Sequence, residues 1–179
     1  FIDVVTRENG LYSTLDLRRS RVFTYDANGW LLYVFCGVGD QVGLIQGPAA
    51  IEALGDQIII LDAQLNRITI YEPTLYAQYI HSAIHYHQIG EYDLAADMWT
   101  QALKFNTNLD QAYSGIGRSL LRQEQFAAAM VNFRLGNNRR DYSKAFALHR
   151  REVISDNFNI IMTALVGVVF ALYLVIKFK

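Results

Sequence analysis

The fold of the N-terminal part is decided by the stretch LDLRRSRVFTY, which occupies residues 15–25. Its pattern recurs 46 residues later. Leu15-Asp16, Arg21-Val22 and Tyr25 correspond to Leu61-Asp62, Arg67-Ile68 and Tyr71. A period of this length is the size of one four-stranded β-propeller blade. Residues 1–73 therefore predict two blades of a partial β-propeller, punctuated by Asn-Gly pairs and a glycine-rich stretch at turns.

The spacing of five residues from Asp16 to Arg21, repeated from Asp62 to Arg67, predicts a tight turn between two strands. We expect each carboxylate to accept backbone N–H groups and each guanidinium to brace the neighbouring strand. These are structural roles. Since propellers need about four to eight blades, two blades cannot close a ring. We therefore expect further blades upstream, in a longer protein of which this chain is a piece.

From Thr74 onward, apolar residues recur at three- and four-residue spacing, which predicts helices. A second repeat, shifted by 34 residues, has the tetratricopeptide period. Its first copy consists of Ala83, Gly90-Glu91-Tyr92, Ala95, Trp99 and Ala102, and its second of Gly117, Glu124-Gln125-Phe126, Ala129, Phe133 and Gly136. We expect the small residues to let paired helices approach closely and the aromatic residues to fill the space between pairs.

Residues 74–140 therefore predict two tetratricopeptide-like helix pairs of an α-solenoid. A third copy would place Arg151 where a small residue belongs, so residues 141–158 are interpreted as a capping or linker helix. The predicted fold class is thus a multi-part α and β chain.

The C-terminal region predicts a transmembrane helix over residues 159–178. Residues 160–176 are uncharged and mostly apolar, and Lys177 and Lys179 follow them. At 1.5 Å per residue this run covers about 25 Å, which suffices for a hydrocarbon core when Phe158, Asn159 and Phe178 contribute at the boundaries. The alternative is a buried helix of a soluble protein. Small residues on one face could seat a second helix: Ala164, Gly167 and Ala171.

Composition excludes several classes of function. The net charge is −1, so no global field attracts nucleic acid, which is an unlikely class of partner for this chain. Cys36 is the single cysteine, which excludes an intramolecular disulfide and a Cys-rich zinc site. His81 and His85 share a helix face, but they lack the Glu of a HExxH motif, and polar residues on the open face of a helix are the stronger interpretation. We predict no metal, no cofactor and no catalytic residue.

The open face of the predicted helix pairs is the candidate partner-binding groove. By the tetratricopeptide frame it contains Ile80, Ile84, His87, Gln111, Ser114, Arg118, Leu121 and Arg122. Arg118 and Arg122 lie one turn apart, and fork-shaped guanidinium groups suit a carboxylate or an acidic peptide segment. Solvated surface arginines are an equally supported alternative.

The first repeat also resembles a known family of blades. Residues 21–29 followed by Leu32-Tyr33-Val34-Phe35 look like the opening of an NHL repeat, although Cys36 replaces the usual glycine and Ile45 the usual aromatic residue. The whole order of NHL-like blades, helical repeats and membrane span resembles a bacterial family. Its members have an NHL propeller, a tetratricopeptide section and a Yip1-like membrane domain, and often accompany sugar ABC-transporter components.

This resemblance implies a membrane-anchored scaffold that binds a protein or a glycan outside the cytoplasmic membrane, beside a transport system. It also implies ABC-transporter components as partners and further membrane helices after Lys179. Basic residues argue for the opposite orientation, because five of them precede the span: Arg139, Arg140, Lys144, Arg150 and Arg151. The alternative function is a lactonase- or lyase-like enzyme with its active site in upstream blades, since residues 1–72 contain no histidine.

Overall fold

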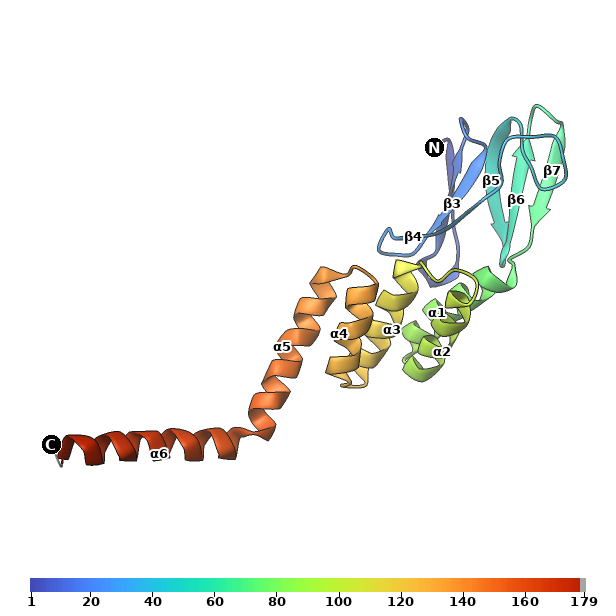
Figure 1. The fold of residues 1–179 in the computed structure, drawn as a ribbon. Helices are drawn as coiled ribbons and strands as arrows, with labels where there is room; N and C mark the ends of the chain where they lie inside the picture. The colour runs from blue at the N-terminus through green and yellow to red at the C-terminus, as the bar shows by residue number, and fades with distance from the viewer. Residues whose placement is uncertain (178–179) are drawn as a thin grey trace.

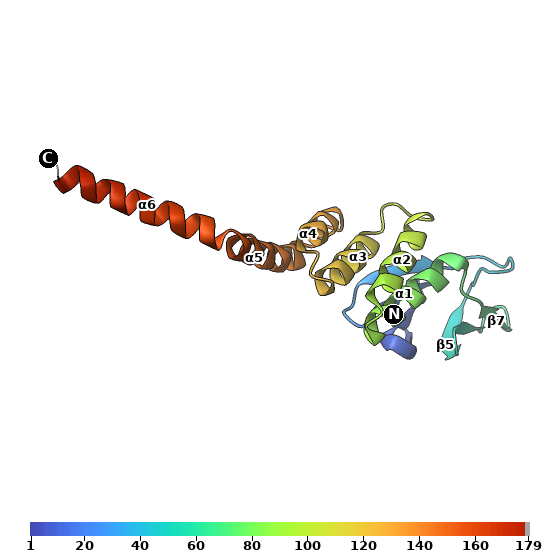
Figure 2. The same cartoon turned by 90° about the horizontal axis from the view of Figure 1, so that it is seen from below.

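The computed structural model describes residues 1–177 and combines two small antiparallel sheets with six α-helices. Figure 1 shows the two sheets side by side at one end of the molecule, with helices α1 to α4 next to them. Helices α5 and α6 then lead away from this body, so that the described C-terminal end lies far from the sheets (Figures 1 and 2). The chain is therefore elongated, with the sheets and the apolar helix α6 at opposite ends.

Each sheet is a simple meander, and the second repeats the first. The strands of the first are β1 (Asp3–Thr6), β2 (Tyr12–Asp16), β3 (Arg21–Tyr25) and β4 (Leu31–Phe35), and those of the second are β5 (Pro48–Leu54), β6 (Gln57–Asp62) and β7 (Arg67–Tyr71). A short 3-10 turn, η1 (Glu8–Gly10), joins β1 to β2. Asp16 pairs with Arg21 across β2 and β3, and Asp62 pairs with Arg67 across β6 and β7. The sequence repeat is thus also a repeat of strand register.

One face of each sheet is buried against the other sheet. The shared core contains Val5, Leu15, Val22, Ile45, Ile51, Ile58 and Ile60. Ile45 comes from the connection between the sheets, and the other positions alternate along the strands with more exposed ones, as the two-residue period of a half-buried strand requires. A hydrogen bond links the sheets directly, because Ile51 N donates to Asp3 Oδ2 at 2.9 Å.

The predicted turn chemistry is present, with one correction. Asp16 accepts from the backbone N–H groups of Arg18 and Arg19, as expected. The Arg67 guanidinium, however, does not brace a neighbouring strand. It donates to the carbonyl oxygens of Asp40 at 3.1 Å and Leu44 at 2.7 Å, which lie in the connection between the sheets. Arg67 therefore fixes the incoming loop, which folds back across β7.

Two residues adopt the left-handed conformation at positions that match a glycine: Cys36, where an NHL repeat usually has glycine, and Glu124, which lies 34 residues after Gly90. Cys36 has φ = 68°, and Glu124, at the turn between two helices, has φ = 62°. The equivalent turn of the first helix pair has Gly90 at φ = 88°. The left-handed conformation favours glycine because it brings the Cβ of any other residue close to the backbone, and glycine has no Cβ. Cys36 and Glu124 therefore keep the glycine geometry without the glycine.

The first five helices pack against one another in chain order. They are α1 (Leu75–Ile89), α2 (Tyr92–Leu103), α3 (Asp110–Arg122), α4 (Phe126–Leu135) and α5 (Arg139–Asp156). Thr74 caps the first of them, since its Oγ1 accepts from Ala77 N. The repeated small and aromatic positions are buried as predicted: Ala83, Ala95, Trp99, Ala102, Ala129 and Phe133. Helix α5 begins two residues before the predicted boundary.

Glycines set the close approach of α3 to its neighbours. A Cβ added at Gly117 would lie 2.7 Å from Phe133 Cε1 on α4, and one at Gly115 would clash with the Trp99 ring on α2. A Cβ at Gly136 would meet the carbonyl oxygen of Asp110 at 2.6 Å. Separations below 3 Å cannot be accommodated without moving a helix or a ring. Helix α3 therefore lies between two aromatic rings that only glycine admits.

The sheets and the helices share a core. Leu11 and Leu32 of the first sheet cluster with Ile80, Trp99 and Ala112 of the helices. Polar contacts join the same elements, because Gln88 Nε2 donates to Asn9 O at 2.7 Å. The first sheet and the helix pairs are therefore one packed unit.

Helix α6 (Phe158–Lys177) is the one described helix long and apolar enough to cross a membrane. Its mean hydropathy is 2.5, and none of it is buried against the rest of the chain. It begins one residue before the predicted span, while Phe178, predicted at the boundary, and Lys179 lie outside the described residues. The predicted packing stripe of Ala164, Gly167 and Ala171 is exposed, and a Cβ at Gly167 would meet nothing within 4 Å.

Candidate partner-binding site

A hollow lies where the helix pairs meet the turns of the first sheet. Its volume is about 170 Å³, and its lining includes Ile84 and His87 of α1, Arg118 of α3, Trp99 of α2, and Asn28 in the β3–β4 turn. The end of α1 is held against the sheet by the Gln88–Asn9 hydrogen bond. The hollow is therefore built by three helices and one hairpin turn, and we call it the groove.

Two basic side chains line the groove, His87 and Arg118, and the charge of Arg122, one turn further along α3, also acts on His87. His87 lies in the last turn of α1, with its ring 5.3 Å from the ring of Tyr92. The pKa of His87 is lowered, first by burial and then by the positive charges of Arg118 and Arg122. Burial and the two guanidinium groups therefore both disfavour the charged form of the imidazole. Its Nδ1 is buried and makes no hydrogen bond to any described residue.

The two arginines make no direct ion pair within the described part of the chain. Over residues 1–177, neither Arg118 nor Arg122 forms a salt bridge with a carboxylate. Asp26 lines the groove, but its Oδ1 accepts from Asn28 N at 2.9 Å and from Trp30 N at 2.8 Å. That carboxylate is thus engaged in its own turn. The groove can accept an anionic group, since two guanidinium forks suit planar carboxylates.

The structure brings together only part of the predicted groove. Ile84, His87 and Arg118 line it, and Arg122 follows one turn after Arg118 at the end of α3. Ile80, by contrast, is fully buried in the core.

The other predicted residues lie elsewhere on the helices. Ser114 is buried, and its Oγ donates to Gly136 O at 3.5 Å. Leu121 packs against the cluster around Phe133, and Gln111 is half-buried on α3. The groove therefore occupies the C-terminal part of α1 and the C-terminal half of α3 rather than their full length. Sequence reasoning missed the contribution of Asn28, because its Asn-Gly pair signals a turn but not what the turn packs against.

His81 and His85 do not face a common site. The Nε2 of His81 lies 2.7 Å from the Tyr33 hydroxyl, whereas the Nδ1 of His85 lies 3.3 Å from Asn9 Oδ1. Over residues 1–177, no three His, Cys, Asp or Glu side chains gather as metal ligands would. The two histidines instead attach α1 to different parts of the first sheet.

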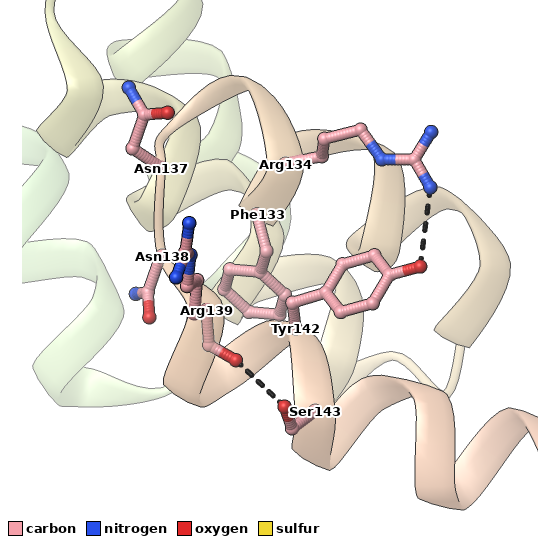
Figure 3. A pocket seen from close by; sticks show the side chains of 7 residues that line it. All are labelled: Phe133, Arg134, Asn137, Asn138, Arg139, Tyr142 and Ser143. Carbon is pink, nitrogen blue, oxygen red and sulfur yellow. Dashed lines mark hydrogen bonds between the residues drawn. The ribbon is translucent and has the colours of Figure 1, made fainter.

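A second hollow, of about 520 Å³, lies at the corner between α4 and α5. Figure 3 shows Arg134 reaching toward Tyr142, where its Nη2 donates to the hydroxyl at 3.2 Å. The guanidinium carbon also lies 5.6 Å from the centre of the same ring. Asn138 caps α5 by accepting from Asp141 N at 3.0 Å. Because these polar groups are engaged in joining α5 to α4, this hollow is a weaker candidate for a binding site than the groove.

Compared with models of known protein families, the chain gives no match, and a comparison with curated protein sequences also finds no match. The function is therefore argued from the geometry of the groove and from α6.

Proposed function

We propose that this protein is a membrane-anchored interaction scaffold whose groove binds an acidic segment of a partner protein. One observation carries the proposal: Arg118 lines the groove beside His87, Arg122 follows one turn later, and neither arginine forms a salt bridge with a carboxylate over residues 1–177. Guanidinium groups left without an anion offer charge-assisted hydrogen bonds to carboxylates of a partner. Components of a membrane transport system are the partner class that the sequence resemblance implies, and a glycan is the alternative ligand.

The two sheets act in this proposal as blades of an NHL-like β-propeller. Their repeated strand register supports this assignment. So does the outward face of the second sheet, where Leu61, Ile68 and Ile70 are exposed. By the 46-residue shift, these positions correspond to Leu15, Val22 and Thr24, which are all buried in the first sheet, and Leu15 and Val22 belong to the core shared with the second. A further blade would cover the outward face in the same way.

The helices act as two tetratricopeptide-like pairs followed by a capping helix. The burial of their small and aromatic repeat positions supports this assignment. Helix α6 anchors the scaffold in the cytoplasmic membrane, and the sheets and groove lie outside the cell. Protease treatment of intact cells tests this orientation, because an N-terminal part that resists the protease would place it inside.

The test of the groove is a double substitution, Arg118→Ser with Arg122→Ser, in the full chain held in nanodiscs. We expect binding of a fluorescent Glu-rich peptide to weaken at least about tenfold, since each charge-assisted hydrogen bond contributes roughly 1.5–3 kcal/mol. Fluorescence polarisation measures the affinity. The matched control is Arg150→Ser with Arg151→Ser, which removes two exposed arginines from α5 and should leave the affinity unchanged.

Two results would contradict the proposal. Equal weakening of peptide binding by both double substitutions would mean that the peptide responds to the net charge of the protein and does not bind in the groove. Full binding by the Arg118 and Arg122 double variant would mean that these arginines are solvated surface residues. Recovery of partners from membrane extracts with the same variants then tests whether natural partners use the same groove.

A further inference from the structure

A third pocket, separate from the groove and from the hollow at α4 and α5, lies in the wedge between the two sheets where α1 begins. Its volume is about 320 Å³, near the lower limit of about 300–1,000 Å³ for small-molecule pockets. Its walls are largely aromatic and aliphatic: Tyr33, Phe35, Ile58, Tyr71 and Tyr76. Two of these rings, those of Phe35 and Tyr71, lie 5.3 Å apart and connect the sheets. The wedge therefore offers an apolar chamber of the size of one small molecule.

One cation reaches this apolar chamber. Arg7 follows β1 and lines the wedge, and its Nη2 donates to Ser13 Oγ at 3.2 Å and to the Tyr33 hydroxyl at 3.4 Å. Its Nε is buried and has no hydrogen-bond partner among the described atoms. No carboxylate of residues 1–177 forms a salt bridge with it. A guanidinium with unused donors in an apolar pocket is incomplete without an anion.

The neighbours of Arg7 supply no anion. The Tyr33 hydroxyl, which accepts from Arg7, also forms a hydrogen bond with His81 Nε2 at 2.7 Å. His81 Nδ1 lies 3.8 Å from Asp56 Oδ1. Ser13 is paired with Thr24 at 2.8 Å. The local network is thus saturated, and the remaining donors of Arg7 are free for a ligand.

The mouth of the wedge limits the charge of that ligand. Asp56 and Glu72 both line the pocket; the Asp56 side chain is 78% exposed, and Glu72 is exposed as well. A ligand with a second negative charge at the mouth would be repelled by these two carboxylates. We propose that the wedge binds a small monocarboxylate with an apolar body, with the carboxylate on Arg7 and the body between the aromatic walls.

The experiment titrates the full chain in nanodiscs with three probes by isothermal calorimetry. The probes are 3-phenylpropionate, its uncharged amide and the dianion phenylsuccinate, which share one apolar body. We expect 3-phenylpropionate to bind at least about tenfold more tightly than the amide and than the dianion. Equal affinity for the acid and the amide, or absence of binding by 3-phenylpropionate, overturns the proposal.

Variants separate the two charges of the wedge. Arg7→Gln should abolish the preference for the acid over the amide, while Arg21→Gln, which removes an exposed arginine of β3, should leave it unchanged. Within residues 1–177, Glu72 makes no hydrogen bond to Arg7 or its partners. Glu72→Gln should therefore bring the affinity for the dianion to within a fewfold of the affinity for the monocarboxylate. Retained preference in Arg7→Gln overturns the proposal. If Arg7→Gln does not fold, the probe series on the unmodified chain and on Glu72→Gln still decides it.

Discussion

Asp16 and Asp62 occupy equivalent turns of the two sheets, yet they are held by different numbers of backbone N–H groups. Asp62 accepts from those of Gln46, Gly47, Gln64 and Leu65, because the connection between the sheets folds over it. Burial raises the pKa of Asp62, but these hydrogen bonds outweigh burial and lower it below its ordinary value. Its contribution to stability is therefore complete above the ordinary Asp pKa and is lost as the pH falls through the lower, folded pKa.

We predict that Asp62→Asn lowers the free energy of unfolding by about 1–3 kcal/mol, because an amide NH₂ would then face a backbone N–H donor. Urea unfolding followed by circular dichroism measures the change. The matched control is Asp16→Asn in the equivalent turn, where the carboxylate accepts from only two backbone N–H groups. We expect a smaller loss there, and equal losses in the two variants would contradict the role of the connecting loop.

His81 makes the stability of the protein depend on pH in a less acidic range than Asp62 does. Burial and then the positive charge of Arg7 lower its pKa from 6.5 to about 4, against the weaker opposing effect of Asp56. The unfolded chain therefore binds a proton more readily than the folded chain between these values. Stability is complete above about pH 6.5 and falls as the pH drops toward 4, by about 3 kcal/mol for a shift of this size.

The prediction is that the urea midpoint of the full chain decreases from pH 7.5 to pH 5, and that His81→Gln removes most of this decrease. His87, whose pKa is also lowered, accounts for a smaller remainder. His85→Gln is the matched control, because this exposed histidine lies one turn away on the same helix. A decrease of the same size in His81→Gln would show that other groups set the acid sensitivity.

At the scale of elements, local chemistry predicted more than long-range packing did. The Asp-to-Arg spacing located two turns because it depends on neighbouring residues, and the 34-residue pattern located buried positions of the helices because each copy repeats the same helix periodicity. The stretch 77–81, which corresponds to β4 by the 46-residue shift, instead belongs to α1, so the second sheet has three strands. The wedge around Arg7 could not be predicted, since Tyr33 and His81 meet across 48 positions of sequence.

The packing of α3 gives a prediction at this scale. Gly117→Ala places a methyl group where Phe133 Cε1 lies 2.7 Å away, so α3 and α4 must separate or the ring must move. We expect the free energy of unfolding to fall by about 1–3 kcal/mol, although alanine favours the helix. Phe133→Leu in the same chain should recover part of the loss, because the double variant shortens the obstructing side chain.

Gly167→Ala is the control for Gly117→Ala, since nothing lies within 4 Å of the added methyl group on α6. It should leave unfolding of the sheets and helices α1 to α5 unchanged. Urea unfolding of both variants, followed by near-ultraviolet circular dichroism, to which the buried Trp99 contributes, measures the difference. Equal effects of the two substitutions would mean that the loss of stability comes from replacing a helical glycine as such and not from the contact with Phe133.

At the scale of the whole molecule, one continuous packed unit is joined to one unpacked helix. Leu11 and Leu32 of the first sheet share a core with Ile80 and Trp99 of the helices, whereas none of α6 is buried. An apolar helix of 20 residues with no intramolecular partner is stable in lipid, where its backbone groups are satisfied internally and its side chains contact hydrocarbon. Folding of the packed unit and attachment to the membrane should therefore be separable properties.

We predict that the full chain stays with the membrane fraction after an alkaline carbonate wash, whereas a chain ending at Asp156 is released. The shortened chain should keep the thermal midpoint of the packed unit, because α6 buries no surface against it. Fractionation followed by circular dichroism measures both properties. If the shortened chain loses its cooperative transition, α6 is part of the folded core. If the full chain is extracted by carbonate, α6 is not an anchor, and the groove would have to reach its partner without attachment through this helix.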